Sequence, residues 1–414
     1  MKNNKAIIIT IGDELLIGQT IDTNSAWMAQ RLNEIGIEVV RRIAVGDTRQ
    51  DIIAALDDAK VNAGLVLITG GLGPTADDIT KPLLCEYFGS KLVLNNEALD
   101  NVKRIFSRRN LPLLERNIKQ AEVPDNCIVL QNRRGTAPGM WFEQEEVIII
   151  SLPGVPHEVM GIMEDAVLPV LSQAAPAKVI VHRHLLTSGL GESFLAERIA
   201  DIENALPPHI KLAYLPNNWI LKLRLTAKGI DEAALITEAE YYQQCIRERI
   251  SDYFISFTDE PFEKILHREF TKENKTLALA ESCTGGYLGH TLTQTDGSSQ
   301  YFMGSIVSYD ASVKETVLKI PKEDIIIHGE VSEAIAMQMA IRVRALLKTS
   351  VGFGITGWLS PSSPEAGTVW MAVSNAHRTV AKKFHFPYDR ERNKEVALQM
   401  AMLTIWKFIN GKAI

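Results

Sequence analysis

Short apolar strands alternate with amphipathic helices over the first 170 residues of the chain. Runs of β-branched and aliphatic residues typical of buried strands occur at 6–10 (AIIIT), 64–71 (GLVLITGG) and 147–151 (VIIIS). Helical patterns lie between them, at 23–35 and 49–60. This alternation predicts an α/β domain whose mostly parallel sheet is covered on both faces. Ligands of such sheets bind beyond the carboxyl ends of the strands, so we expect a site formed by loops 12–14 and 70–80.

The length of 414 residues indicates two or three domains. An Ala/Pro-containing stretch at 172–178 and the segment TDEP at 258–261 mark the boundaries. We therefore predict an N-terminal α/β domain over 1–170, a small α+β domain over 171–255 and a C-terminal α/β domain over 256–414. The net charge of −6 gives no general attraction for nucleic acid or for an anionic membrane.

The cysteines and the N-terminus both favour a cytoplasmic protein. The four cysteines are scattered without a C-x-x-C pair, which argues against a zinc site and against a disulfide framework. The apolar run near the N-terminus meets Asp13 and Glu14 before a signal peptide or a membrane span is complete. We expect no membrane association.

The loop 70–80 (GGLGPTADDIT) has the composition of an anion-binding turn. Gly70, Gly71 and Gly73 allow successive backbone N–H groups to face one concavity, and Thr75 and Thr80 can add hydroxyl donors. The loop lacks the spacing of a P-loop and of a dinucleotide fingerprint. Asp77 and Asp78 lie in the same loop and would repel a bound phosphate. A cation such as Mg²⁺ between the carboxylates and the phosphate would remove this repulsion. Alternatively, the two aspartates cap the helix that follows.

Further carboxylates stand near the ends of other strands in the same predicted sheet. They are Asp13, Glu14, Asp22 and Asp47. Their convergence on one rim of the sheet would provide a metal site, and metal-assisted attack on a phosphoanhydride is the chemistry that such a site favours.

A second candidate site lies at residues 281–286 (ESCTGG), directly after the apolar run 276–280. This places a hydroxyl and a thiol on a strand-to-helix turn, where backbone N–H groups and the helix dipole can stabilise an oxyanion. Ser282 and Cys283 are both candidate nucleophiles, and Cys283 is the stronger one when ionised. The alternative is that Ser282 and Thr284 only cap the helix.

Four segments of the first 160 residues resemble the N-terminal half of the competence/damage-inducible CinA family, which is related to MoaB/MogA-like three-layer domains. The segments are GDELLIGQTIDTNS (12–25), TGGLGPTADDIT (69–80), NRRGTAPG (132–139) and LPGVPHEVM (152–160). The resemblance implies ADP-ribose pyrophosphatase activity with a divalent ion (Mg²⁺, Mn²⁺ or Co²⁺), and K⁺ is a further candidate cofactor. It implies metal ligation by Asp13, Asp22, Asp47 and Asp78. It implies substrate binding by Gly18, Gly70, Gly71, Gly73 and Thr80. The strand-end loops themselves add Gly12 and Thr75 as candidate substrate-binding residues.

The C-terminal third resembles the CinA C-terminal domain and, through it, nicotinamide-nucleotide amidase. The resemblance rests on ESCTGG (281–286), GSS (297–299), VSYDASVK (307–314) and the VS of GEVS (329–332). It implies Ser282 as nucleophile, Tyr309 and Lys314 as its proton-handling partners, Thr356 as a further catalytic residue, and Gly285, Gly286 and Arg390 as substrate-binding residues. A desolvated lysine can serve as the base where no suitable histidine is present.

The chain departs from the family at GITGWLSPSSPEAGTVW (354–370), where Trp358, Leu359 and Ser360 replace small residues. We expect this bulk to narrow the site that deamidates nicotinamide mononucleotide. Three hypotheses therefore stand: a bifunctional hydrolase of pyridine-nucleotide salvage; a pyrophosphatase whose C-terminal domain serves dimerisation or ligand sensing; and a non-catalytic partner in DNA uptake or repair. We expect nucleotide ligands, a homodimer and no direct contact with nucleic acid.

Overall fold

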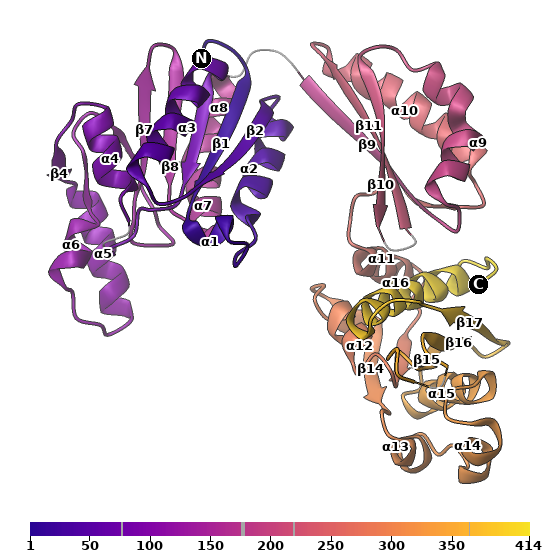
Figure 1. Ribbon diagram of the computed structural model, residues 1–414. Coiled ribbons are helices and arrows are strands. Elements are labelled where there is room, and N and C mark those ends of the chain that lie inside the picture. Colours follow the sequence, from indigo (N-terminus) through magenta and orange to yellow (C-terminus); the bar gives the residue numbers. More distant parts are fainter. Residues whose placement is uncertain (76–77, 175–178, 218–219, 364) are drawn as a thin grey trace. The chain divides into compact units, whose positions relative to one another are not determined.

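The computed structural model describes residues 1–75, 78–174, 179–217, 220–363 and 365–414 (Figure 1). Its contacts divide the chain into two compact units. The first unit consists of 1–182 together with 208–210 and 226–239, and the second consists of 183–207, 211–225 and 240–414. The division thus runs through the middle region of the sequence.

The N-terminal region contains a six-stranded sheet in the order β2-β1-β3-β8-β7-β6. Its strands are β1 (Lys5–Ile11), β2 (Glu38–Val45), β3 (Leu65–Thr69), β6 (Ile128–Leu130), β7 (Gly139–Gln144) and β8 (Val147–Leu152). The first four strands of this order pair in parallel, and β7 is antiparallel to both of its neighbours. The mostly parallel sheet expected from the sequence is confirmed.

Helices cover both faces of this sheet (Figure 1). Side chains alternate along a strand, so Ile7 and Ile9 pack against α3 (Arg49–Asn62) and α4 (Thr80–Tyr87). Ala6 and Ile8 pack on the other face. The elements covering that face are α2 (Thr23–Glu34), α7 (Pro156–Ile162), the π-helical turn η1 (Met163–Val167) and α8 (Leu168–Ala174). This is the expected three-layer arrangement.

Shorter elements complete the N-terminal region. They are α1 (Asp13–Leu16), α5 (Asn96–Arg108), α6 (Glu115–Lys119) and the antiparallel pair β4 (Leu92–Leu94) and β5 (Glu122–Pro124).

The middle region contains a four-stranded sheet in the order β10-β11-β9-β12, with two helices. The elements are β9 (Val179–Ser188), α9 (Glu192–Asn204), β10 (Ile210–Asn217), β11 (Ile220–Gly229), α10 (Glu232–Arg249) and β12 (Phe254–Ser256). Alternate residues of β11 are buried, as expected for a sheet with one packed face. The α+β composition matches the expectation.

The C-terminal region contains a five-stranded sheet in the order β14-β13-β15-β16-β17. Its strands are β13 (Leu277–Glu281), β14 (Phe302–Val307), β15 (Val351–Gly357), β16 (Thr368–Ser374) and β17 (Thr379–His385). Strand β13 is parallel to both β14 and β15, whereas β16 and β17 join antiparallel. The carboxyl end of β13 therefore lies between two parallel neighbours, where ligands of such sheets bind.

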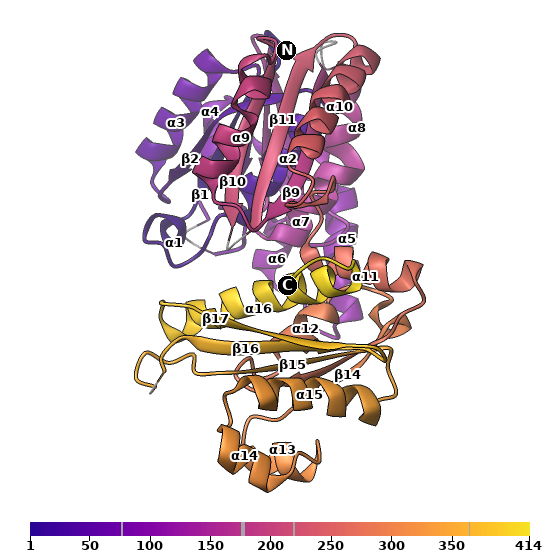
Figure 2. The ribbon, with the colours of Figure 1, turned by 90° about the vertical axis from the view of Figure 1, so that its right-hand side faces the viewer.

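This sheet also has helices on both faces (Figure 2). Leu277 and Leu279 belong to the core beneath α11 (Phe262–Lys272), α12 (Tyr287–Leu292) and α16 (Arg390–Ile409). Ala278 and Ala280 face α15 (Glu333–Leu346). The remaining elements are η2 (Ser298–Gln300), α13 (Ala311–Thr316) and α14 (Lys322–His328). Among the described residues, no helix is long and apolar enough to span a bilayer.

Candidate active sites

The turn that carries Ser282 is fixed by both neighbours of β13. The Ser282 N–H donates to the Ile355 carbonyl of β15 at 3.0 Å, and the Ser308 N–H, just beyond β14, donates to the Glu281 carbonyl at 2.7 Å. The Ser282 side chain is 7% exposed. The sheet thus presents one hydroxyl at its carboxyl edge with little freedom to move.

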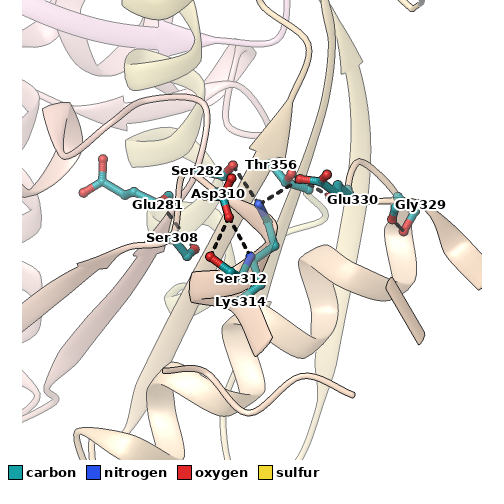
Figure 3. A network of polar contacts seen from close by, with 10 residues as sticks. Glu281, Ser282, Ser308, Asp310, Ser312, Lys314, Gly329, Glu330 and Thr356 are labelled. Carbon is teal, nitrogen blue, oxygen red and sulfur yellow. Dashed lines mark hydrogen bonds and ion pairs between the residues drawn. The ribbon is translucent and has the colours of Figure 1, made fainter. Parts of the chain in front are cut away.

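Glu281 anchors this turn from below. Its fully buried carboxylate accepts hydrogen bonds from four donors, with distances of 2.8–3.0 Å. The donors are Thr284 Oγ1, Leu288 N, Gly289 N and Ser305 Oγ. Two of these donors belong to the first turn of α12, where unpaired N–H groups favour an anion. Figure 3 shows the Glu281 side chain directed away from Lys314, so this carboxylate is a structural group of the turn.

Lys314, on α13, directs its amine at the Ser282 hydroxyl (Figure 3). Nζ lies 3.3 Å from Ser282 Oγ, and the lysine side chain is 1% exposed. Burial lowers the pKa of the Lys314 ammonium, and the Glu330 carboxylate, with Oε2 at 3.5 Å, opposes this decrease. A buried lysine in contact with a hydroxyl is the arrangement that a serine–lysine dyad requires.

Thr356, at the end of β15, supports the same group of residues. Its buried hydroxyl donates to the Glu330 backbone carbonyl at 2.8 Å. The structure therefore places Thr356 beneath the segment that carries Glu330, and it places both close to Lys314 (Figure 3).

Cys283 is unsuited to the role of nucleophile. Its side chain is 7% exposed and belongs to the core beneath α16. Burial raises the pKa of the Cys283 thiol to about 12, so that the thiol stays protonated at neutral pH. Of the two candidates in the turn, the geometry favours Ser282.

Tyr309 and Arg390 form a pair of their own. Arg390 Nη2 donates to Tyr309 Oη at 2.9 Å, and the tyrosine is 59% exposed. Tyr309 is thus placed with the arginine expected to bind anions, and its hydroxyl is not a partner of the Lys314 amine. Gly285 and Gly286 have φ values of +62° and +91°, which favour glycine, and they lead into α12.

One bulky residue of the segment that departs from the family, Leu359, packs in the interior of the domain. Leu359 is 2% exposed and joins the core beneath α16, and Asn393 Nδ2 donates to its carbonyl at 2.9 Å. The Trp358 N–H donates to the Thr368 carbonyl at 2.8 Å, which continues the strand pairing by one step. The bulk of Leu359 therefore fills the interior.

In the N-terminal region, Gly70 and Gly71 have backbone conformations and surroundings that exclude larger residues. Their φ values are +114° and +65°. A Cβ atom on Gly70 would lie 2.2 Å from the Ile11 carbonyl oxygen, and one on Gly71 would lie 2.1 Å from Thr80 Oγ1. Within the described residues, buried Thr80 Oγ1 has no hydrogen-bond partner. The loop is thus folded closely onto β1 and α4, and the Gly70 N–H, expected to face an anion, donates instead to the Leu152 carbonyl at 3.2 Å.

The expected metal ligands are only partly brought together. Asp13 and Asp47 exchange hydrogen bonds between side chain and backbone, whereas Asp22 caps α2 through Ser25. Asp78 accepts from the Thr75 N–H at 2.9 Å and also from its hydroxyl, and Asp77 lies outside the described residues. No group of three or more acidic, histidine or cysteine side chains able to hold a metal occurs in the part of the chain that the structure describes.

A small pocket lies at the carboxyl ends of β1 and β3. It measures about 110 Å³, and its lining includes Asp22, Asn24, Thr69 and Gly70. This is below the roughly 300–1,000 Å³ of pockets that enclose whole small molecules. The pocket has room for only a small group, and its lining also includes Glu14. Of the other expected residues, Gly12 lies against the Glu14 carboxylate, and Gly18 is exposed with φ +74°.

Three charged residues of these regions carry roles that the sequence patterns did not assign. Glu281 was part of a recognised motif, but its spacing gave no sign that it is an anchor. Glu330 is brought to Lys314 only by the fold. Glu158 connects segment 152–160 with segment 132–139, because Asn132 Nδ2 donates to Glu158 Oε2 at 2.6 Å. Burial raises the pKa of the Glu158 carboxyl group.

Family models match the chain in three successive parts. A probable molybdopterin binding domain matches residues 7–173, the damage-inducible protein CinA KH domain matches 182–256, and the CinA C-terminal domain matches 259–409.

Relatives match along the full length. A CinA-like protein of Flavobacterium psychrophilum is 43% identical over 414 residues, which covers 98% of both chains. A putative competence-damage inducible protein of Caldicellulosiruptor saccharolyticus is 35% identical and covers 98% of this chain and 99% of its own. The crystal structure of the protein CinA with unknown function from Thermoplasma acidophilum covers 42% of this chain and 99% of its own, at 31% identity and a TM-score of 0.37. The chain belongs to the CinA family.

Proposed function

We propose that the C-terminal domain is an amidase that uses a Ser282–Lys314 dyad to deamidate nicotinamide mononucleotide. The observation that carries this proposal is the 3.3 Å contact between a buried lysine amine and the hydroxyl at the carboxyl edge of the sheet. Serine is a weak nucleophile unless a base takes its proton, and a desolvated lysine is such a base. Leu359, one of the three residues that replace small ones in this segment, packs in the core and so does not narrow the site.

The chemistry follows from this pair. The neutral Lys314 amine takes the Ser282 proton while Oγ bonds to the amide carbon, and the resulting ammonium returns a proton to the leaving nitrogen. Ammonia departs as the C–N bond breaks and leaves an ester on Ser282. Water, deprotonated by the same amine, then attacks the ester and releases the carboxylate.

Arg390 and Tyr309 are the residues that we propose for the phosphate of this substrate. Arginine is suited to phosphate because its planar fork of N–H donors matches the oxygens of the group. Tyr309 accepts from one of those N–H groups and holds the guanidinium in place. Gly285 is close to a second cation, because a Cβ atom there would lie 3.9 Å from Lys394 Nζ.

For the N-terminal domain we propose ADP-ribose hydrolysis with a divalent ion. Asp13 and Asp47 would hold the ion, and phosphate oxygens of the substrate would complete its shell, as is common for Mg²⁺. The ion would supply charge neutralisation at the phosphoanhydride. The Gly71 backbone and the hydroxyl of Thr80 would then bind phosphate, whereas the Gly70 N–H already donates to the Leu152 carbonyl.

The test is ammonia release from nicotinamide mononucleotide by the purified chain, with ADP-ribose hydrolysis measured in the same preparation. Ser282→Ala should abolish ammonia release and leave ADP-ribose hydrolysis at its original rate. Cys283→Ala is the matched control, because it alters the neighbouring side chain, and it should keep the deamidation. An unchanged rate in Ser282→Ala, or loss only in Cys283→Ala, would refute the assignment of the nucleophile.

We also propose that the middle region makes no direct contact with nucleic acid. KH domains hold nucleic acid through a GxxG loop. The glycines of residues 182–256 are Gly189, Gly191 and Gly229, and no two of them have that spacing. Filter binding of labelled single-stranded RNA and DNA at low salt should show no retention, and saturable retention would contradict the proposal.

A further inference from the structure

Glu330 is the second polar partner of the Lys314 amine (Figure 3). Its Oε2 lies 3.5 Å from Nζ, while Ser282 Oγ lies 3.3 Å from the same atom. The lysine side chain is 1% exposed, and that of Glu330 is 43% exposed. The amine therefore lies between a hydroxyl in the interior and a carboxylate at the surface.

The backbone around Glu330 is fixed from several sides. Its carbonyl accepts from Thr356 Oγ1 at 2.8 Å, and the Gly329 N–H donates to the Ile325 carbonyl at 2.9 Å. Ser332 begins α15 as its N-cap and also donates to the Gly329 carbonyl. These contacts fix the backbone from which the Glu330 side chain extends, and the buried Lys314 side chain distinguishes the contact from an ion pair between two exposed side chains.

The other groups that face Lys314 leave Glu330 as its main counter-charge. Cys283, from the turn after β13, carries a thiol that burial keeps protonated. Asp310, the N-cap of α13, is exposed and accepts from both the N–H and the hydroxyl of Ser312. The contact with Glu330 thus favours the ammonium form, against burial, which favours the neutral amine.

We propose that Glu330 is a positioning residue that holds the Lys314 amine against Ser282 and keeps it protonated at neutral pH. The dyad then becomes fully nucleophilic only at alkaline pH, because an ammonium cannot accept the serine proton. This inference rests on the amidase proposed above, since it assigns Glu330 to the same dyad. The Thr356 hydroxyl donates to the backbone carbonyl of Glu330, so Thr356 acts on Lys314 only through Glu330.

The experiment measures how fast an alkyl fluorophosphonate modifies Ser282 between about pH 6 and about pH 10. The serine oxygen bonds to phosphorus, fluoride leaves, and Lys314 takes the proton, so the rate reports the dyad without any natural substrate. Intact-protein mass spectrometry follows the modification, and Ser282→Ala defines the background. For Glu330→Gln we expect the midpoint of the rate profile to move to lower pH by roughly one unit, the usual effect of losing one nearby opposite charge.

Two further variants separate the charge of Glu330 from its structural contribution. Glu330→Asp keeps the charge and should retain a midpoint close to that of the original protein. Glu315→Gln removes a charge next to Lys314 in sequence, but Glu315 is exposed, so the midpoint should not move. A purely structural role of Glu330 predicts slower modification at every pH with an unchanged midpoint, and that result would overturn the inference.

Ammonia release from nicotinamide mononucleotide by the same samples separates this inference from the proposed function. A shifted midpoint in Glu330→Gln without ammonia release by the original protein would remove the proposed substrate and leave the role of Glu330 standing. Ammonia release by the original protein, together with identical pH–rate profiles for the original protein and Glu330→Gln, would support the proposed substrate and remove the role of Glu330. If Ser282 were unmodified at every pH, both the dyad and the role of Glu330 would be wrong.

Discussion

Asp13 and Asp47 each accept a hydrogen bond from the backbone of the other. The Asp13 N–H donates to Asp47 Oδ2 at 3.0 Å, and the Asp47 N–H donates to Asp13 Oδ1 at 3.2 Å. The exchange joins the loops that follow β1 and β2, which are adjacent parallel strands. It brings two carboxylates together at the edge of the sheet where ligands of this fold class bind.

The first prediction concerns this pair. Asp47→Asn keeps an oxygen that can accept from the Asp13 N–H, so the fold should be retained, but it removes one of the two carboxylate charges of the pair. We expect metal-dependent hydrolysis of ADP-ribose to fall by at least about 10-fold to 100-fold, the loss typical of residues that only support a metal ligand. Titration of Mn²⁺ against the hydrolysis rate measures the effect. Full activity of the variant at the original metal concentration would show that the pair of Asp13 and Asp47 only connects two loops and does not bind the metal.

The second prediction compares two glycines with nearly the same φ value. Gly71 and Gly89 have φ values of +65° and +62°, but only Gly71 is crowded, by Thr80. Gly89→Ala should cost about 1 kcal/mol of stability from backbone strain alone. Gly71→Ala should cost clearly more and should also abolish hydrolysis of ADP-ribose. Denaturant unfolding of both variants provides the measurement, and equal losses would show that the crowding around Gly71 is relieved at no cost.

The third prediction is a dependence of stability on pH that originates in Lys81. Its amine is buried and donates to the carbonyls of Lys119 and Gln120, and burial lowers its pKa to about 8 from 10.5. Between these two values the unfolded chain binds more protons at this site than the folded chain does, so the stability of the N-terminal domain rises with pH. The rise from this one group is at most about 3 kcal/mol.

Lys81→Met removes this titration. Native-state hydrogen exchange of β3, measured from pH 8 upward, reports the free energy of unfolding of both proteins. The free energy of the original protein should increase relative to that of the variant up to about pH 10.5. A constant difference across this range would mean that the amine keeps its ordinary pKa.

The fourth prediction concerns Glu281. Glu281→Gln leaves an amide N–H₂ facing N–H and hydroxyl donors, so at least one of four hydrogen bonds to a buried carboxylate is lost. We expect a loss of about 3 kcal/mol in the C-terminal domain and slower fluorophosphonate modification of Ser282. Glu273→Gln, which removes an exposed partner of Lys275, should change stability by less than about 1 kcal/mol. Guanidinium unfolding of both variants tests this, and comparable losses would contradict the anchoring role.

The layered architecture could be predicted from the sequence because its strands are unusually apolar. Residues such as Ile7 to Ile9 lie in a strand buried on both faces, and such strands read as continuous hydrophobic runs. The antiparallel strands β16 and β17 were harder to predict, because pairing direction depends on connections between elements and is not written in the composition of either strand.

The sites were predictable to the extent that their residues are adjacent in sequence. Ser282 and the glycines of loop 70–80 follow strands directly, so the strand ends located them. Glu330 reaches Lys314 from 16 residues further along the chain, and no local pattern marks such a contact. The size of Leu359 indicated that it narrows the site. Its side chain lies in the core, and the direction of a side chain depends on the tertiary structure.

The parallel pairing of β1, β3 and β8 has a consequence for synthesis of the chain. Ile7 pairs with Val66, and Val66 pairs with Ile149, so the sheet joins segments separated by more than half of the first domain. A chain that emerges from the ribosome with its N-terminus first has β1 and β3 available long before β8. The Gly70 N–H donates to the Leu152 carbonyl, which means that the glycine loop acquires this contact only after that late strand has emerged. The N-terminal site therefore cannot be complete until Leu152 has been made, although most of its residues are among the first to be made.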